Sequence, residues 1–231
     1  MTHEYVKKLI KPGVTTKYLN DEADKFIREN GGIPSFLNYQ GFPASICISI
    51  NEEVVHGIPK ERILKNGDII SIDIGVLKDG YHSDSANTYP VGTIDKEKER
   101  LIYHTKKMLY LGLEEIKDGA KLYNIGASIS KYAKKHNYGV IRELVGHGVG
   151  SLLHEDPDVP NYGTYNTGMI LKSGMVLAVE PMINSGSRHI SFLDDDWTIV
   201  TRDGKPSAHF EHTVVVTKDG YEILTGEWKS G

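Results

Sequence analysis

Residues 69–84 read IISIDIGVLKDGYHSD, and this stretch decides the fold. Its first part is an apolar β-strand pattern, and Asp79-Gly80 forms a favoured two-residue hairpin turn. A hairpin closed at that turn places Asp84 opposite Gly75, with Asp73 two residues farther along the same face. Diagonal neighbours on one face of a hairpin are close enough to interact. The stretch therefore predicts two carboxylates within reach of one shared ion.

A carboxylate inside an apolar strand needs a physical reason, because burying its charge is costly unless it is paired or metal-bound. Asp73 lies among isoleucines, and Glu180 follows the apolar residues Val176, Leu177 and Val179. A salt bridge or an acidic surface face explains any one such residue. Neither explains a set placed in pairs.

The pairing comes from an internal repeat. The segment LKNGDIISIDIG, residues 64–75, resembles LKSGMVLAVEPM, residues 171–182, which aligns Asp73 with Glu180. Upstream, KPGVTTKYL from Lys11 resembles KDGAKLYNI from Lys117, and a third echo aligns Asp84 with Glu211. Three echoes in the same order predict one domain, residues 1–231, built from two related halves at about 1–105 and 106–231.

The expected fold class is α+β, with a mainly antiparallel sheet from both halves covered by helices on one face. Apolar residues at helical spacing appear after each turn of the repeat. The predicted helices span residues 4–10, 16–30, 95–116 and 122–137. The predicted strands span residues 45–50, 68–77, 81–91, 141–145, 175–184, 196–201 and 208–217.

The four carboxylates favour a metal site, and they would balance the charge of two divalent ions. His147, in Gly146-His147-Gly148, is the candidate nitrogen ligand, since glycines let the backbone approach closely. A lone Gly-His-Gly usually marks a turn, so this assignment depends on the carboxylates. Oxygen ligands with an imidazole suit Mn, Fe, Co or Zn.

Composition excludes several other classes. The net charge of -4 and pI near 6.2 argue against a dedicated nucleic-acid binder, including a DNA binder. The single cysteine, Cys47, excludes a disulfide framework and a multi-thiolate site. The first residues carry no apolar signal-peptide core, and no apolar run approaches the roughly 18 residues of a membrane span. We expect a cytoplasmic monomer.

Five segments resemble the type I methionine aminopeptidases, which have the pita-bread fold. They are NEEVVHGIP from Asn51, SIDIGVLKDGYHSD from Ser71, VGHGVGSLLHEDP from Val145, LAVEPM from Leu177 and HFEHTVVV from His209. The resemblance implies a metalloexopeptidase that removes the initiator methionine of nascent chains when the second residue is small. It also implies transient contact with the ribosome.

The resemblance further implies a role for each site residue. Asp84 and Glu211 would bridge two divalent ions, Asp73 would bind one, and His147 and Glu180 would bind the other. A hydroxide between the ions would attack the scissile carbonyl, and Glu180 would help move protons. His154 would contact the substrate carbonyl, and His56 would donate to the scissile amide nitrogen or steady the intermediate. The methionine pocket would draw on Tyr39, Phe42, Cys47 and Trp197.

The sequence also departs from the family pattern in places and allows other interpretations. Tyr39, Phe42, Cys47 and Trp197 could instead be ordinary core residues, and Leu153 stands where relatives often carry an aromatic residue. Only ten residues precede Lys11, whereas relatives usually begin with a longer helix. The alternative functions are an X-Pro peptidase of the same fold, a non-catalytic binding module, and a structural or RNA-associated factor.

Overall fold

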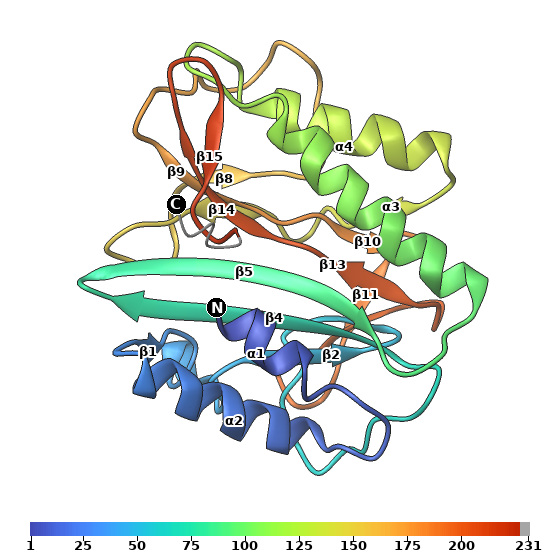
Figure 1. The fold of residues 1–231 in the computed structure, drawn as a ribbon. Coiled ribbons are helices and arrows are strands. Elements are labelled where there is room, and N and C mark those ends of the chain that lie inside the picture. The colour runs from blue at the N-terminus through green and yellow to red at the C-terminus, as the bar shows by residue number, and fades with distance from the viewer. Residues whose placement is uncertain (227–231) are drawn as a thin grey trace.

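The computed structural model describes residues 1–226 and has the expected α+β organisation (Figure 1). The helices are α1 (Thr2–Lys7), α2 (Thr16–Glu29), α3 (Lys96–Leu113) and α4 (Tyr123–Lys135), with a short 3-10 turn, η1, at Tyr39–Gly41. The strands in the first half are β1 (Ile33–Pro34), β2 (Cys47–Ile50), β3 (Glu53–Val55), β4 (Ile69–Lys78) and β5 (Tyr81–Pro90). Those in the second half are β6 (Gly139–Val140), β7 (Gly146–Gly148), β8 (Glu155–Val159), β9 (Val176–Val179), β10 (Met182–Asn184), β11 (Ile190–Phe192), β12 (Ile199–Thr201), β13 (Ser207–His209), β14 (His212–Val216) and β15 (Tyr221–Ile223).

The four predicted helices form, each within a few residues of the expected ends. The Thr15 hydroxyl accepts a hydrogen bond from the Tyr18 N–H at the start of α2, and the Asp95 carboxylate does the same for Lys98 at the start of α3. Such caps satisfy backbone donors that lack a partner in the first helical turn. The starts of α2 and α3 follow from these local interactions.

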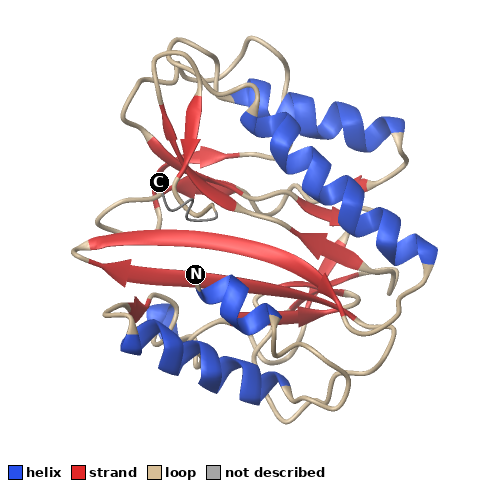
Figure 2. Cartoon of the chain, viewed as in Figure 1, coloured by secondary structure: helices blue, strands red, loops and turns tan. Residues whose placement is uncertain are grey.

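The long β4–β5 hairpin crosses the middle of the molecule, with α1 and α2 on one side and α3 and α4 on the other (Figures 1 and 2). Leu19, Ala23 and Ile27 of α2 pack in one core cluster with Ile70 and Ile72 of β4. A second cluster joins α3 and α4 to β9 and β14. The helices therefore cover the strands through two separate apolar clusters.

The strands form four small sheets rather than the one continuous sheet expected from the sequence. The orders are β1-β4-β2 with β5 beside β4, then β13-β10-β6, β11-β12-β3 and β15-β14-β9-β7-β8, and every pairing is antiparallel. The predicted strand 175–184 breaks between β9 and β10 at Glu180-Pro181, where proline has no N–H to donate. The predicted strand 208–217 breaks at Phe210-Glu211. Both breaks fall at predicted metal ligands.

The predicted strand 141–145 is wrong, because the strands lie on either side of it as β6 and β7. Within this segment the Glu143 carboxylate accepts from the Arg142 N–H and also pairs with Arg188, so the backbone bends instead of extending. None of the helices formed by residues 1–226 combines the length and apolar character needed to cross a membrane.

Candidate active site

A cavity of about 810 Å³ contains every site residue expected from the sequence. Its lining includes the predicted ligands Asp73, Asp84, His147, Glu180 and Glu211. It also includes the predicted substrate residues Tyr39, Phe42, Cys47, His56, His154 and Trp197, together with Leu153. Segments from both ends of the chain therefore converge on one cavity.

The hairpin geometry predicted for the first carboxylate pair is confirmed. Gly75 lies opposite Asp84, and Asp73 lies opposite Ala86. Both turn residues, Asp79 and Gly80, have positive φ, at 52° and 84°, as a type I′ turn requires. The two carboxylates consequently share one face of the hairpin.

The second carboxylate pair is placed by the pairing of β9 with β14. Val179 lies opposite His212, so Glu180 leaves the end of one strand beside the start of the other, where Glu211 stands. The position of Glu211 could not be read from the sequence, because the longer excursion before it hides the register.

His147 lies on the short strand β7 and pairs with Ala178 of β9. The glycines on both sides are required by close packing. A Cβ at Gly146 would lie 2.3 Å from the Ala178 carbonyl oxygen, and one at Gly148 would lie 2.3 Å from the Asp156 carbonyl oxygen. The imidazole Nδ1–H donates to the Gly148 carbonyl at 2.8 Å, which leaves the Nε2 lone pair available as a ligand.

The acidic residues of the site lie close enough together to repel one another when they are ionised. Burial and the neighbouring carboxylates raise the pKa of Asp73, Glu180 and Glu211 well above their usual values, and burial raises the pKa of Asp84 to about 7. Oδ1 of Asp73 and Oδ1 of Asp84 are buried and have no hydrogen-bond partner among residues 1–226. Carboxylates held together in this way are stabilised by a bound cation.

The distances among the ligand atoms suit a divalent metal. Ligand atoms of Asp84, His147 and Glu211 lie within 4.8 Å of one another. The His147 Nε2 is 3.7 Å from Glu180 Oε1 and 3.9 Å from Asp84 Oδ2. A mixed oxygen and imidazole donor set fits a first-row divalent ion. The side chains of this site therefore fit a divalent metal ion.

His56 follows β3 in a strained backbone conformation, with φ of 57°. The next residue is anchored, because the Gly57 N–H donates to the Ser49 hydroxyl at 3.1 Å. A Cβ at Gly57 would lie 2.2 Å from the Ile48 carbonyl oxygen. Burial lowers the pKa of His56 to about 4, which keeps the ring neutral. Strain of this kind is kept where the surrounding structure fixes a functional side chain.

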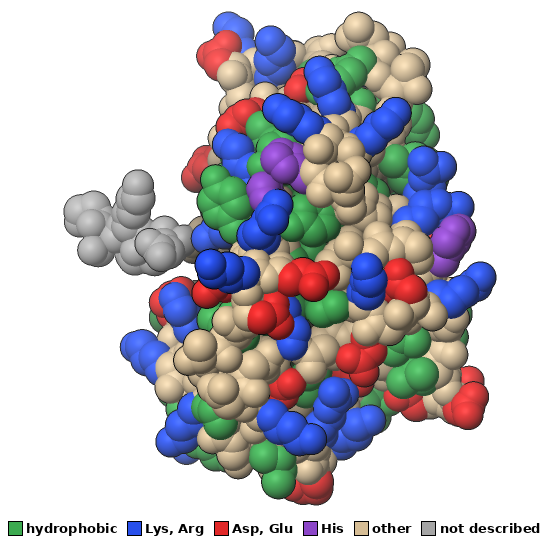
Figure 3. All heavy atoms as spheres, turned by 90° about the vertical axis from the view of Figure 1, so that its right-hand side faces the viewer, with side chains coloured by type: hydrophobic (Ala, Val, Ile, Leu, Met, Phe, Trp, Pro, Cys, Tyr) green, Lys and Arg blue, Asp and Glu red, His purple; other side chains and the backbone are tan. Residues whose placement is uncertain are grey.

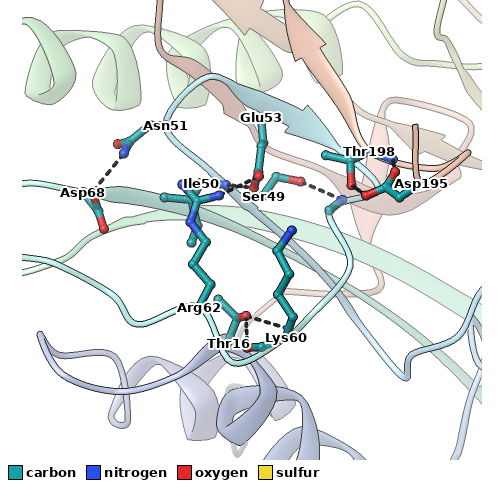
Figure 4. Close-up of polar contacts among 11 residues, drawn as sticks. Thr16, Ser49, Ile50, Asn51, Glu53, Lys60, Arg62, Asp68, Asp195 and Thr198 are labelled. Atoms are coloured by element: carbon teal, nitrogen blue, oxygen red, sulfur yellow. Dashed lines mark hydrogen bonds and ion pairs between the residues drawn. The ribbon is translucent and has the colours of Figure 1, made fainter. Parts of the chain in front are cut away.

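A polar network braces the loop that carries His56, and Figure 4 shows its Glu53–Arg62 and Thr16–Lys60 contacts. The Glu53 carboxylate accepts from the Ile50 N–H at 2.8 Å and from Arg62 at 2.6 Å. The Thr16 hydroxyl donates to the Lys60 carbonyl at 2.8 Å and accepts from the Lys60 N–H. These contacts tie the loop to α2 and to strand β2.

An apolar cluster forms another wall of the cavity. It consists of Phe36, Phe42, Ala44, Cys47 and Leu153, with Tyr39, Ile58 and Trp197 packed against it. The rings of Phe42 and Trp197 meet edge to face at 5.1 Å. Trp197 lies within a turn in which the Asp195 carboxylate accepts from the Trp197 N–H and from the Thr198 hydroxyl, and Figure 4 shows the Asp195–Thr198 contact. Burial raises the pKa of the Cys47 thiol, so Cys47 acts as an apolar side chain. Such a wall suits a flexible thioether.

The cavity residues for which no role was predicted from the sequence include His209 and Phe36. His209 is buried, and its Nε2 lies 3.5 Å from Glu180 Oε2. Its position two residues before Glu211 is a usable signal, because alternate residues of an extended segment share a face. Phe36 lines the apolar wall, and no motif in the sequence singles it out.

Comparisons with known proteins agree with this site. Residues 1–218 match the model of metallopeptidase family M24. The chain is 56% identical over 225 residues to methionine aminopeptidase 1 of Bacillus subtilis, covering 97% of this chain and 91% of that protein.

Solved structures give the same picture. Methionine aminopeptidase from Rickettsia prowazekii superposes with a TM-score of 0.96 at 48% identity, covering 97% of this chain and 91% of the other. The Xaa-Pro dipeptidase of Bacillus anthracis, at 23% identity, shares the fold with a TM-score of 0.78, and the match spans only 57% of its length. The chain therefore belongs to metallopeptidase family M24, and within that family to the type I methionine aminopeptidases.

Proposed function

We propose that this methionine aminopeptidase removes the initiator methionine from nascent proteins and peptides whose second residue is small. One observation carries the proposal: buried carboxylates and an imidazole share a cavity with an apolar cluster suited to a thioether. The ligand group accounts for hydrolysis, and the apolar cluster accounts for methionine.

Two divalent ions, chosen from Co, Mn, Fe or Zn, would be held by the acidic face of the cavity. The residues that would hold them are Asp73, Asp84, His147, Glu180 and Glu211. When bound, the ions supply a hydroxide nucleophile by lowering the pKa of water from 15.7 toward about 7.

The protein's own side chains would orient the substrate and move protons. Glu180 is a proton carrier in this scheme, and the buried His209 lies 3.5 Å from its carboxylate. His154 donates a hydrogen bond to the substrate carbonyl, and His56 donates near the scissile nitrogen. Burial lowers the pKa of both rings to about 4, so both are neutral donors near pH 7.

The test is release of methionine from Met-Ala-Ser by chelated protein after addition of Mn, Co, Fe or Zn. Metal-restored release is expected, with none from Asp84→Ala. A peptide of the X-Pro type should remain uncut, and preferential cleavage of it would favour the alternative peptidase. Folded protein that binds no metal at saturating Mn or Co would support a non-catalytic binding module.

His154 is tested separately, because its proposed role leaves the ligand set unchanged. His154→Ala should keep the metal content of the parent protein and lower kcat on Met-Ala-Ser. Unchanged kinetics would remove the proposed role of His154.

The ribosome contact is proposed to use a basic hollow away from the active site. It is formed by α4, β6 and the loops at 162–165 and 186–188, and its cations are Lys131, Lys134, Arg142 and Arg188. Its lining among the described residues contains no Asp or Glu, and one of its cations, Arg188, pairs with Glu143 outside that lining. Figure 3 shows Lys and Arg side chains over the whole of the face toward which α4 runs, with fewer Asp and Glu side chains in its upper half. Basic and tyrosine side chains together suit RNA.

Charge reversal tests this contact. Lys131→Glu with Lys134→Glu should weaken cosedimentation with ribosomes and reduce its salt dependence, while Met-Ala-Ser turnover stays unchanged. The matched control is the exposed pair Lys7→Glu with Lys8→Glu on the opposite helix layer. Equal ribosome binding by all three proteins would contradict the assignment.

The chain is further proposed to act in the cytoplasm as a monomer and as a single catalytic domain of two related halves, about 1–105 and 106–231. The supporting observation is that each half contributes one carboxylate pair from neighbouring antiparallel strands. Sedimentation of the purified protein tests the monomer, and loss of activity in either half expressed alone tests the single domain.

A further inference from the structure

Tyr39 contacts His154 through its hydroxyl group. The phenolic oxygen lies 2.8 Å from the imidazole Nδ1, and the two rings stack at 5.3 Å between centroids with an angle of 30°. Among residues 1–226 the Tyr39 hydroxyl has no other hydrogen-bond partner, and the His154 Nε2 has none. The contact is therefore the one polar constraint on this imidazole within the described chain.

The chemistry of the pair gives the contact a direction. A phenol is a good donor and a poor acceptor, whereas the unprotonated nitrogen of a neutral imidazole is a strong acceptor. The Tyr39 O–H therefore donates to Nδ1. The ring proton of neutral His154 then resides on Nε2, which is free to donate.

The neighbouring His147 is held in the opposite tautomer. Its Nδ1–H donates to the Gly148 carbonyl at 2.8 Å, so its Nε2 carries a lone pair. The two imidazoles pack at 4.1 Å between centroids. One ring must accept a metal while the other donates to substrate, so each needs its own partner to fix its tautomer.

The backbone around Tyr39 is shaped to hold the hydroxyl in place. Asn38 and Gln40, on either side, both have left-handed φ values, 66° and 50°. The Asn38 N–H donates to the Phe42 carbonyl at 2.8 Å, and the Tyr39 N–H donates to the Phe36 carbonyl at 2.9 Å. Two non-glycine residues in that conformation are costly, and such strain persists where the surroundings fix a functional group.

We propose that Tyr39 is a positioning residue whose hydroxyl fixes His154 in the Nε2–H tautomer, ready to donate to the carbonyl of the substrate. This assignment goes beyond a role for Tyr39 in the methionine pocket, and it rests on the proposed function of His154.

Tyr39→Phe removes the hydroxyl and keeps the ring in the apolar cluster. Loss of one hydrogen bond should lower kcat on Met-Ala-Ser about 3- to 10-fold, with KM changed less than about twofold and metal content unchanged. In a His154→Gln background the same substitution should have no further effect. Tyr5→Phe is the matched control, since the Tyr5 hydroxyl bonds Glu22 on α2.

The tautomer is read directly from long-range proton–nitrogen NMR spectra of the zinc-loaded enzyme with ¹⁵N-histidine, with His154 assigned from His154→Gln. The parent protein should show a protonated Nε2, and Tyr39→Phe should show exchange between both tautomers. A protonated Nδ1 in the parent protein, or an unaltered His154 spectrum in Tyr39→Phe, would overturn the proposal.

The kinetic outcomes are equally decisive. A raised KM with unchanged kcat in Tyr39→Phe would place the hydroxyl in methionine binding and overturn the proposal. If His154→Ala leaves turnover unchanged, the role of His154 fails, and the spectra still decide whether Tyr39 fixes the ring.

Discussion

The Thr213 side chain binds both backbone groups of Asp84, the N–H and the carbonyl. The Thr213 hydroxyl accepts from the Asp84 N–H at 2.9 Å and donates to the Asp84 carbonyl at 2.7 Å. Two residues along, the Glu211 N–H donates to the Ala86 carbonyl, and two further, Thr88 makes the same pair of contacts with His209. These links join β5 to the β13–β14 segment and bring the two carboxylate pairs together.

Thr213→Val should therefore destabilise the protein, because it leaves two buried backbone groups of Asp84 without partners. We expect a loss of about 1–3 kcal/mol in the free energy of unfolding, together with weaker Mn binding as Asp84 shifts. Urea unfolding and calorimetric titration measure the two effects. Thr213→Ser keeps the hydroxyl and should restore the metal affinity; equal affinity in the valine and parent proteins would contradict the clamp.

Much of the site could be predicted from local sequence. The hairpin register of Asp73 and Asp84 follows from a two-residue turn, because side chains alternate along a strand. The helices follow from apolar spacing, and in the structure the caps Thr15 and Asp95 fix the starts of α2 and α3. In each case the determining interactions lie within a few residues of one another.

Long-range features were less accessible. The Tyr39–His154 contact joins residues 115 positions apart, and no pattern in either segment predicts it. The strand break at Glu180-Pro181 also escaped prediction, since the apolar pattern continues through it. Strand β8, Glu155–Val159, contains three acidic residues and a proline, so it lacks the composition typical of a strand.

Gly75 is the residue directly opposite Asp84, and it has no room for a side chain. A Cβ there would lie 2.6 Å from a ring carbon of Phe36 and 2.9 Å from the Ser35 Cβ. Gly75→Ala should cost about 1–3 kcal/mol by overpacking and should lower kcat/KM by displacing the apolar wall. Gly220→Ala, which meets nothing within 4 Å, is the control. Equal melting temperatures for the two variants would contradict the packing argument.

Asp84 is central to the predicted ligands, since its carboxylate lies near both His147 and Glu211. Asp84→Ala should reduce turnover of Met-Ala-Ser by more than about 100-fold, because even partners outside the ligand set typically cost 10- to 100-fold. Metal content, measured by atomic emission, should fall with it. The exposed Glu97→Ala should behave like the parent protein. Full activity in Asp84→Ala would remove the site assignment.

Stability should depend on pH and metal together. The folded pKa of Asp84 is about 7 against 3.8 unfolded, and the pKa values of Asp73, Glu180 and Glu211 are raised as well. The folded protein then binds more protons than the unfolded chain, so stability falls as pH rises through the folded pKa values.

The buried histidines contribute with the opposite sign, since their folded pKa values, such as about 3 for His209, lie below 6.5. The histidines no longer change the stability with pH above about 6.5, where histidine is mostly neutral in both the folded and the unfolded state. Between about pH 6.5 and 8.5 the carboxylates therefore decide the slope.

The melting temperature of chelated protein should fall across that range. Saturating Mn should raise it, and the gain should grow with pH because the metal competes with protons for the carboxylates. Asp84→Asn, which cannot ionise, should flatten the slope of the chelated protein and reduce the gain from Mn. If the melting temperature of the chelated protein rises from about pH 6.5 to 8.5, the pKa values of these buried carboxylates are not raised in the folded protein.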